Sequence, residues 1–523
     1  MRRDRVRKAI ADIAIIGGGI NGCGIARDAI GRGLSVVLFE RSDLGSGSSS
    51  ASTKLLQGGS NHLRPLDLRS ARASLAESAV LQRAAPHIIR PLRFILPYPS
   101  EFRAAWRVRS GFLLHNYLGG RSPLPSAKRL DLRRAPGGQP LNATCVRGYE
   151  YWDYQVDDSR LVILTALDAA SRGAVIRTRT EVLTTHRKRD HWVIKFRDEL
   201  SQREQELAAR VLVNAAGPWV SDVSEHCLGQ LDQKPRRLVK VSHIIVPRQW
   251  TGDHAYMFHQ GAEHGVFAFP YERNFTLIGA TKVDVTRDPS KVRVEPSEVD
   301  YLCARASECL KTPIDRSRVV SAFSSVHSLH DDPPADGRPA KQEYVLDLDT
   351  RQDAATLLTV HGGTIITFRR LAEDALRKLK RDFPRMGEAW TRLAPLPGGR
   401  FPVDGHDALV ADVLRLSPAC SLQLATRLVH SYGTFALDIA RGTEREDDWG
   451  MVFGADLSER EVQYLVTREW ARTAEDIVWR RSKLGYHMTG AQISALNAWM
   501  SEHFHAPAPL LSGSSGQMRK VHW

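Results

Sequence analysis

One stretch near the start of the chain restricts the possible folds more than any other. Residues 12–16 form a short, mostly β-branched run, and the glycine-rich turn 17–22 follows it directly. Residues 23–31 then have a helical pattern, and a second apolar run, 34–39, ends at Glu40. The order strand, glycine turn, helix, strand and acid is typical of an α/β unit that binds a dinucleotide.

Each glycine of this turn has a separate physical task. Gly17 permits the tight turn, Gly19 lets the backbone approach a pyrophosphate, and Gly22 allows the helix to pack closely against the strand. The N-terminus of the helix offers N–H groups and a positive dipole to the diphosphate. Glu40 is placed to accept hydrogen bonds from a ribose. Because NAD and FAD both use this fingerprint, the turn alone leaves the nucleotide open.

Three later segments have the composition of chain that lies against a long ligand. Residues 43–54 are rich in small hydroxyl side chains, whereas 211–220 and 357–369 are apolar strands that run into glycines. A flexible linker is the alternative for the first of them. We interpret all three as one ligand site, with the candidate residues Ser49, Ser50, Ser52, Lys54, Gly217, Gly362, Gly363 and Thr364.

Composition excludes several other classes of protein. With 523 residues, 42% of them hydrophobic and 25% charged, the chain has the make-up of a globular protein of about three domains. The formal charge of +14 is spread along the chain without interleaved aromatics, which argues against nucleic-acid binding. No apolar run approaches the roughly 18 residues of a spanning helix. The six cysteines form neither CxxC nor a zinc spacing, so we expect no metal site and a reduced, cytoplasmic protein.

Two longer stretches carry a more specific signature. They are GYEYWDYQVDDSRLV at 148–162 and REWARTAEDIVWRRSKLG at 468–485. Together with the glycine segments, they resemble the FAD-dependent glycerol-3-phosphate dehydrogenases, the quinone-linked members of the DAO-type flavoprotein superfamily. The resemblance covers nearly the whole chain. It implies FAD as cofactor, oxidation of sn-glycerol 3-phosphate to dihydroxyacetone phosphate, and electron transfer to quinone. It also implies peripheral association with the cytoplasmic face of the inner membrane, often as a homodimer.

The resemblance also assigns roles to two residues. His243 matches a substrate-site histidine of the family and is the candidate base for the substrate hydroxyl. Arg369 matches the arginine after the third glycine segment, and we expect it to hold the substrate or to stabilise charge on the reduced flavin.

Several positions depart from the family pattern at the expected substrate site. Asn61, His62 and His327 stand where the family has arginine, tyrosine and arginine, and Thr364 replaces a lysine. Losing a charged hydrogen bond to phosphate costs on the order of 1.5–3 kcal/mol. Two alternatives therefore stay open. One is a divergent FAD oxidoreductase for another alcohol, a hydroxy acid or an amine, and the other is a catalytically degenerate flavin-binding protein.

We expect an α/β fold in which a Rossmann-like FAD-binding domain is interleaved with a mostly antiparallel β substrate cap, over residues 1–390. Strand-like runs at 173–182, 191–196, 243–247, 265–270 and 275–279 are assigned to the cap. A C-terminal helical domain, 395–505, includes a helical pattern at 461–483, and 506–523 is expected to be a loose tail. Residues 93–120 mix aromatics with arginines and are either a membrane-contact surface or a core helix.

Overall fold

The computed structural model describes residues 10–56, 68–98, 124–230, 236–258, 265–286, 288–330, 344–351, 353–504 and 519–520. The chain divides into two compact units and passes repeatedly from one to the other. Unit 1 consists of Met1–Ser50, Ser159–Leu238 and His327–Gly513, and unit 2 of Ala51–Asp158, Val239–Val326 and Ser514–Trp523.

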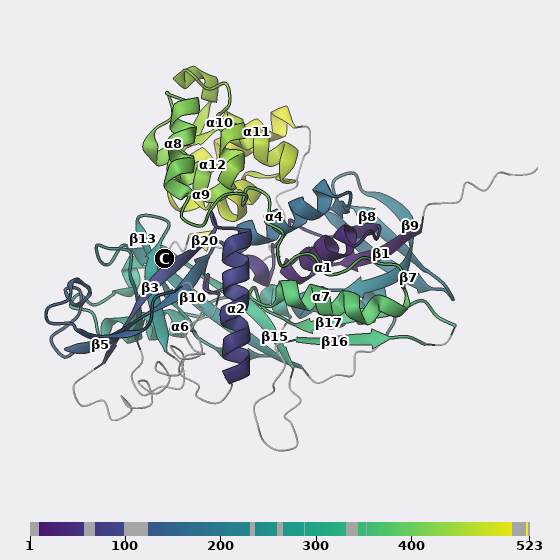
Figure 1. Ribbon diagram of the computed structural model, residues 1–523, viewed down its shortest axis with the longest axis horizontal. Helices are drawn as coiled ribbons and strands as arrows, with labels where there is room; N and C mark the ends of the chain where they lie inside the picture. Colours follow the sequence, from purple (N-terminus) through teal and green to yellow (C-terminus); the bar gives the residue numbers. More distant parts are fainter. Residues whose placement is uncertain are drawn as a thin grey trace, which may run out of the picture. The chain divides into compact units, whose positions relative to one another are not determined.

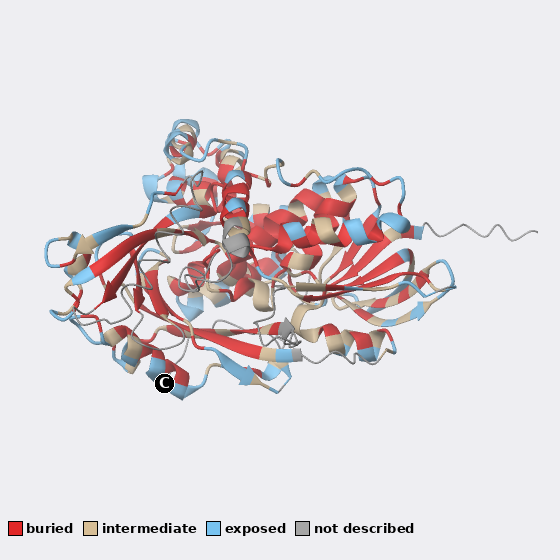
Figure 2. Ribbon diagram, turned by 60° about the horizontal axis from the view of Figure 1, so that its bottom comes forward, coloured by how far each residue is buried: buried red, intermediate tan, exposed pale blue. Residues whose placement is uncertain are grey.

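Unit 1 is built on an eight-stranded sheet whose central strands are parallel. The parallel strands, in spatial order, are β17 (Leu357–Gly362), β9 (Arg203–Asn214), β1 (Ile10–Ile16), β2 (Val36–Phe39) and β6 (Val175–Arg177). The antiparallel additions are β16 (Tyr344–Asp349), β7 (Thr180–Arg187) and β8 (Trp192–Asp198). Strands β1, β2 and β17 are buried along nearly their whole length (Figure 2). Such continuous apolar strands are typical of a parallel sheet covered by helices.

The helices of this α/β layer are α1 (Ile20–Gly31), α4 (Asp158–Ser171), the single turn α5 (Val220–Asp222) and α7 (Phe368–Lys378). Helices α1 and α7 lie side by side (Figure 1). They approach closely at Gly24, where an added Cβ would lie 2.8 Å from the Phe368 ring. The expected Rossmann-like arrangement is therefore confirmed in unit 1.

Two of the strand runs assigned to the cap lie in the sheet of unit 1 instead. Residues 173–182 contribute to β6 and β7, and 191–196 to β8. An alternating pattern predicts a strand but does not identify the partner beside which it lies. Here β8 pairs antiparallel with β9, from Trp192 opposite Ala209 to Asp198 opposite Arg203, so the run extends the cofactor-binding sheet.

Unit 2 contains the second, mostly antiparallel sheet, which has ten strands. They are β3 (Ile89–Tyr98), β4 (Lys128–Asp131), β5 (Arg147–Val156), β10 (Arg236–Pro247), β11 (Ala255–Phe258), β12 (Val266–Tyr271), β13 (Phe275–Gly279), β14 (Val283–Val285), β15 (Ser321–His330) and β20 (Arg519–Lys520). The pair β11 and β3 is parallel, whereas β10–β13, β12–β13 and β3–β5 are antiparallel. Among the described residues of unit 2, the helices are α2 (Leu68–Ala84) and α6 (Pro296–Ser307), and α6 packs on β12 and β13. This sheet is the expected cap.

The aromatic and basic stretch at 93–120 begins inside this sheet. Residues 93–98 are the end of β3, so the core-helix interpretation is wrong for them. Phe94 is fully buried and stacks on Tyr151, with ring centroids 5.2 Å apart, so its ring is unavailable to a membrane. Residues 99–123 lie outside the described residues. Within the described ranges, no helix has both the length and the apolar character needed to span a bilayer.

A group of C-terminal helices has its own apolar core, which includes Val413, Leu428, Tyr432, Leu465 and Ile477. The elements are α8 (His406–Leu416), α9 (Leu422–Tyr432), α10 (Ala436–Ala440), α11 (Glu459–Arg468), the π-helical turn η11 (Asp476–Arg481), α12 (Gly490–His503) and the short strands β18 (Val452–Gly454) and β19 (Leu457–Ser458). The expected helical domain is therefore present.

The helical pattern at 461–483 is not one helix. Helix α11 ends at Arg468, because Trp470 adopts a left-handed conformation with φ of 56°. The helical conformation resumes only at η11. Of the expected tail, 506–523, only Arg519 and Lys520 are described, and they pair with Ala322 and Ser321 of β15.

Candidate functional site

The predicted dinucleotide segments of unit 1 meet at one edge of its parallel sheet. Gly17 follows β1, Glu40 follows β2, the segment 215–217 follows β9, and Gly362 ends β17. Neighbouring strands are joined there, because the Gly17 N–H donates to Phe39 O at 2.9 Å and the Ala215 N–H to Ile16 O at 2.9 Å. The carboxyl edge of a parallel sheet is where ligands bind in α/β folds.

Two glycines of the fingerprint are required by their surroundings. Gly17 has φ of 113°, and a Cβ built on it would lie 2.5 Å from the carbonyl oxygen of Ala215. A Cβ on Gly22 would lie 2.0 Å from the carbonyl oxygen of Gly17. Any larger residue must push the backbone apart at these points. The turn therefore keeps the narrow, side-chain-free backbone that a pyrophosphate needs.

Glu40 is held at the turn through both carboxylate oxygens. Oε2 accepts from the Gly18 N–H at 2.7 Å, and Oε1 accepts from the Ser42 N–H at 2.8 Å. Burial raises the pKa of Glu40 above its ordinary value, while the hydrogen bonds from Ser42 and Gly18 oppose this shift. A carboxylate has about four acceptor positions, so two bonds leave capacity for the ribose hydroxyls predicted from the sequence.

The N-terminus of α1 points to an anionic or hydroxyl-rich ligand. Its first turn contains no acidic residue, and Ser49 Oγ accepts from the Ile20 N–H at 3.1 Å. Asn21 donates through Nδ2 to Gly362 O at 3.0 Å, which ties the first and third glycine segments together. Among the described residues, Asn21 Oδ1 is buried and has no hydrogen-bond partner. This set of groups fits a dinucleotide.

The other predicted residues of unit 1 differ from one another in burial and in local contacts. Gly217 begins the short helix η4 (Gly217–Trp219) with φ of 59°, and a Cβ there would meet open space. Ser50 is buried and donates to Gly47 O at 3.4 Å, within its own turn. Gly363 has φ of 87° beside Asn21, and Thr364 is exposed, with its Oγ1 3.2 Å from Thr367 Oγ1.

Arg369 lies inside the first turn of α7 and is buried. Its Nη1 donates to Glu373, one helical turn later, and lies 3.4 Å from Thr391 Oγ1. These contacts identify a packed ion pair within unit 1, and a catalytic or substrate-holding role for Arg369 stays a prediction.

Ser52 and Lys54 belong to unit 2, because the chain passes from one unit to the other after Ser50. The N–H and Oγ of Ser52 donate to Asp158 Oδ2 at 3.0 and 2.7 Å, and Lys54 Nζ lies 2.6 Å from the same oxygen. Lys54 is buried, has φ of 59°, and places Nζ 5.3 Å from the centroid of the Phe323 ring. The structure therefore groups these two predicted residues around Asp158.

His243 is fully buried in β10, opposite Gly279 of β13. A Cβ on Gly279 would lie 2.1 Å from Cδ2 of the imidazole, so the missing side chain makes room for the ring. On another side His243 stacks on Phe323, with centroids 4.9 Å apart and an interplanar angle of 16°. The predicted base is thus fixed in orientation by packing. The contributions of Phe323, Gly279 and Asp158 were missed, and only the presence of Asp158 in the stretch 148–162 was a signal for them.

The residues that depart from the family pattern are placed only in part. Asn61 and His62 lie outside the described residues. His327 is half-buried in β15.

Comparison with known proteins agrees with this geometry. The family described as FAD dependent oxidoreductase matches residues 12–368, and the C-terminal domain of alpha-glycerophosphate oxidase matches residues 389–503. The D-erythritol 1-phosphate dehydrogenase of Brucella abortus is 42% identical, over 93% of this chain and 97% of its own. The glycerol-3-phosphate dehydrogenase of Pseudomonas aeruginosa is 40% identical, over 95% and 96%.

A solved structure has the same fold. The glycerol-3-phosphate dehydrogenase of Bacillus halodurans, complexed with FAD, superposes with a TM-score of 0.73 at 23% identity and covers 95% of this chain and 91% of its own. The chain therefore belongs to the FAD-dependent oxidoreductases, is an enzyme with FAD as its cofactor, and falls within the glycerol-3-phosphate dehydrogenase family.

Proposed function

We propose that the enzyme oxidises a short polyol phosphate at a secondary hydroxyl, and that sn-glycerol 3-phosphate, converted to dihydroxyacetone phosphate, is its first candidate substrate. The observation that carries this proposal is the buried imidazole of His243, held between Phe323 and Gly279 in the cap sheet. Oxidation of the alcohol releases one proton from oxygen and one hydride from carbon. His243 accepts the proton at a ring nitrogen, and bound FAD supplies the acceptor for the hydride.

The cofactor is proposed to lie along the carboxyl edge of the unit 1 sheet. The turn at Gly17, Gly19 and Gly22 and the start of α1 would hold its pyrophosphate, and Glu40 its ribose. The other proposed contacts in unit 1 are Ser49, Ser50, Gly217, Gly362, Gly363 and Thr364. In unit 2, Ser52 and Lys54 are fixed around Asp158, and their role as cofactor contacts stays a prediction from the sequence.

D-erythritol 1-phosphate is the second candidate substrate. The relative named for that substrate is 42% identical to this chain, against 40% for the glycerol-3-phosphate dehydrogenase of Pseudomonas aeruginosa. The replacements at Asn61, His327 and Thr364 support an altered site, because neutral side chains and histidine grip a phosphate less strongly than arginine. Arg369 is proposed as a remaining cation for the substrate.

Anaerobic flavin bleaching tests the substrate. The purified holoenzyme is mixed in turn with sn-glycerol 3-phosphate, D-erythritol 1-phosphate, the two unphosphorylated polyols, a hydroxy acid and an amine, and the visible absorption of oxidised flavin is followed. We expect rapid bleaching by a phosphorylated polyol only. Bleaching by a hydroxy acid or an amine alone would replace the proposal with another substrate class, and a flavin that no compound reduces would identify a degenerate enzyme.

We further propose quinone as electron acceptor and peripheral contact with the cytoplasmic face of the inner membrane, both on the family resemblance. A soluble quinone analogue should reoxidise the reduced enzyme faster than dissolved oxygen does, and the enzyme should float with vesicles of anionic lipid. Sedimentation velocity tests the proposed homodimer.

A further inference from the structure

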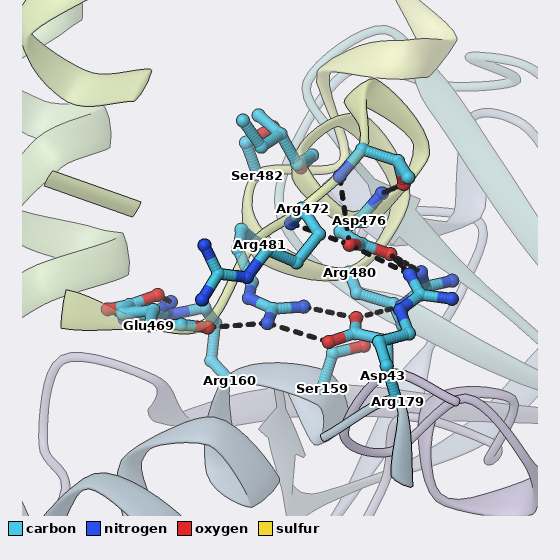
Figure 3. A network of polar contacts seen from close by, with 12 residues as sticks. Asp43, Ser159, Arg160, Arg179, Glu469, Arg472, Asp476, Arg480, Arg481 and Ser482 are labelled. Atoms are coloured by element: carbon cyan, nitrogen blue, oxygen red, sulfur yellow. Dashed lines mark hydrogen bonds and ion pairs between the residues drawn. The ribbon is translucent and has the colours of Figure 1, made fainter. Parts of the chain in front are cut away.

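The stretch 468–485, singled out in the sequence, has no part in the proposed chemistry. In the structure, part of it folds into η11 and forms a buried ionic network with the segment that follows β2 (Figure 3). We call the following residues the Asp43 network: Asp43, Arg179, Asp476, Arg480 and Arg481. All of them belong to unit 1.

Asp43 is bound by two consecutive arginines of η11. Arg481 donates from Nη2 to Oδ1 at 2.8 Å and from Nη1 to Oδ2, so its guanidinium grips the carboxylate with two bonds. Arg480 donates from Nε to Oδ2. Asp43 is 1% exposed and the Arg481 side chain 0%, so water contributes little to holding these charges. Removing one partner of such a buried pair is strongly destabilising, because the other charge stays buried without compensation.

Asp476 connects the same arginines to a second part of unit 1. Arg179 donates to its Oδ1 at 2.7 Å, and Arg480 donates to the same oxygen. The N–H groups of Arg472 and Thr473 donate to Oδ2 at 2.9 and 3.1 Å. Burial opposes the ionisation of Asp476, but the charges of Arg480 and Arg179 outweigh it and lower its pKa below the ordinary value.

The Asp43 network adjoins, in sequence, a residue that contacts Glu40, which is itself held at the glycine turn. Asp43 follows Ser42, whose N–H donates to Glu40 Oε1 at 2.8 Å. The backbone of the Arg179 region holds the same loop, because the Arg179 N–H donates to Ser42 O at 2.9 Å and the Thr180 N–H to Glu40 O at 2.8 Å. The Gly45 N–H then donates to Gly18 O at 3.0 Å, inside the glycine turn. The loop 40–45 is thus fixed on one side by the turn and on the other by η11.

We propose that Asp43, Arg480 and Arg481 are positioning residues for FAD, through which the C-terminal segment holds the loop 40–45 in the conformation that binds the cofactor. A preorganised loop binds its ligand more tightly because less ordering accompanies binding. Coupling of this kind is reciprocal, so FAD also stabilises the docked C-terminal segment. The inference rests on the placement of FAD at the glycine turn and is independent of the substrate.

A matched pair of arginine substitutions tests the proposal. Arg427 is a second buried arginine, bound to Glu461 by two bonds of 2.7 Å and to Asp456, but these partners belong to the C-terminal helical domain. Lysine cannot form the paired hydrogen bonds that Arg481 makes to Asp43 and Arg427 makes to Glu461. We therefore expect Arg481→Lys and Arg427→Lys to lower the Tm of the apoprotein, and Arg481→Lys alone to weaken FAD binding.

The readout is the dissociation constant of FAD, measured by fluorescence titration of each apoprotein well below its Tm and without substrate. For Arg481→Lys it should rise about tenfold, and for Arg427→Lys it should stay within about twofold of wild type. Equal constants for the two variants would overturn the proposal. Asp43→Asn, which keeps the shape of the side chain, should repeat the Arg481→Lys result.

A measurement on the unaltered protein covers the case in which these variants do not fold. Hydrogen exchange at the amides of Arg472, Thr473 and Ser482 should slow by about tenfold when FAD is added to the apoprotein, while the amides of α9 change little. Exchange at 472–482 that is insensitive to FAD would overturn the coupling. Because no substrate is present, this result is separate from the flavin bleaching test.

Discussion

The carboxyl edge of the unit 1 sheet is built largely from backbone, whereas the sheet of unit 2 presents its candidate groups as side chains. In unit 1, Gly17 and Gly22 are needed because a single Cβ would lie within 2.5 Å of a carbonyl oxygen. In unit 2, His243 depends on a neighbouring ring and on the missing side chain of Gly279, and Lys54 depends on Asp158.

This difference matches two physical tasks. A pyrophosphate is held by many N–H groups at close range, which only a chain without side chains can supply. Proton transfer needs one titratable atom in one orientation, which packing around a side chain supplies. Substitutions in the glycine turn of unit 1 should therefore change cofactor binding, and substitutions around His243 in unit 2 should change the reaction while the cofactor stays bound.

The largest expected effect is at His243. In His243→Asn the proton acceptor is lost, and the rate of anaerobic flavin reduction by the substrate should fall about 100- to 10,000-fold with an unchanged flavin content. Stopped-flow absorption measures the rate. The control is His254→Asn, in the same unit immediately before β11, since His254 bonds Tyr256 at 2.8 Å and has no assigned part in the reaction. A rate in His243→Asn within a few-fold of the control would assign the proton transfer to another group.

Gly22→Ala, in contrast to His243→Asn, should lower the flavin content of the enzyme. The new Cβ meets Gly17 O at 2.0 Å, and overpacking of this kind costs about 3 kcal/mol of folding free energy. The purified variant should lose most of its flavin, measured as the ratio of visible to ultraviolet absorption. Gly490→Ala is the matched control, because a Cβ there meets nothing within 4 Å, and it should retain its flavin. A Gly22→Ala variant that retains full flavin would break the assignment of the turn to FAD.

A further prediction concerns the response of unit 2 to mild acid. Burial, aided by the charges of Arg93 and Arg248, lowers the pKa of His254 to about 4. An unfolded histidine has a pKa of about 6.5, so folding favours the neutral ring. The contribution of His254 to the free energy of unfolding is therefore fully present above about pH 6.5. It is lost progressively down to about pH 4, by up to about 3 kcal/mol. Urea unfolding at several pH values should show a shallower loss in His254→Asn, and parallel curves for the two proteins would contradict this account.

The two units also differed in how much the sequence could predict. The fingerprint from Gly17 to Glu40 was correctly located because its constraints act over a few residues and leave a fixed glycine spacing. The runs at 173–182 and 191–196 were correctly predicted as strands but assigned to the wrong unit, because periodicity contains no information about the partner strand. Sequence spacing likewise contains no sign that Asp43 meets Arg481, 438 residues later.

The surroundings of His243 were beyond prediction for a related reason. Phe323 and Gly279 reach the imidazole through strand register across β10, β13 and β15, and register is set by the whole sheet. The histidine was identified by family resemblance alone, since a single histidine in a strand has no distinguishing pattern.

The smallest expected effect is at Gly279, where a substitution adds one methyl group beside the imidazole of His243. In Gly279→Ala the Cβ would lie 2.1 Å from Cδ2 and 2.9 Å from Nε2 of His243, so the ring must turn. We expect flavin content to stay unchanged and flavin reduction to slow by about tenfold, equivalent to about 1.4 kcal/mol. If the loss acts through the imidazole, Gly279→Ala should have no further effect in the His243→Asn background, because the two changes remove the same interaction. An additional tenfold loss in the double variant would mean that Gly279 affects the reaction independently of His243.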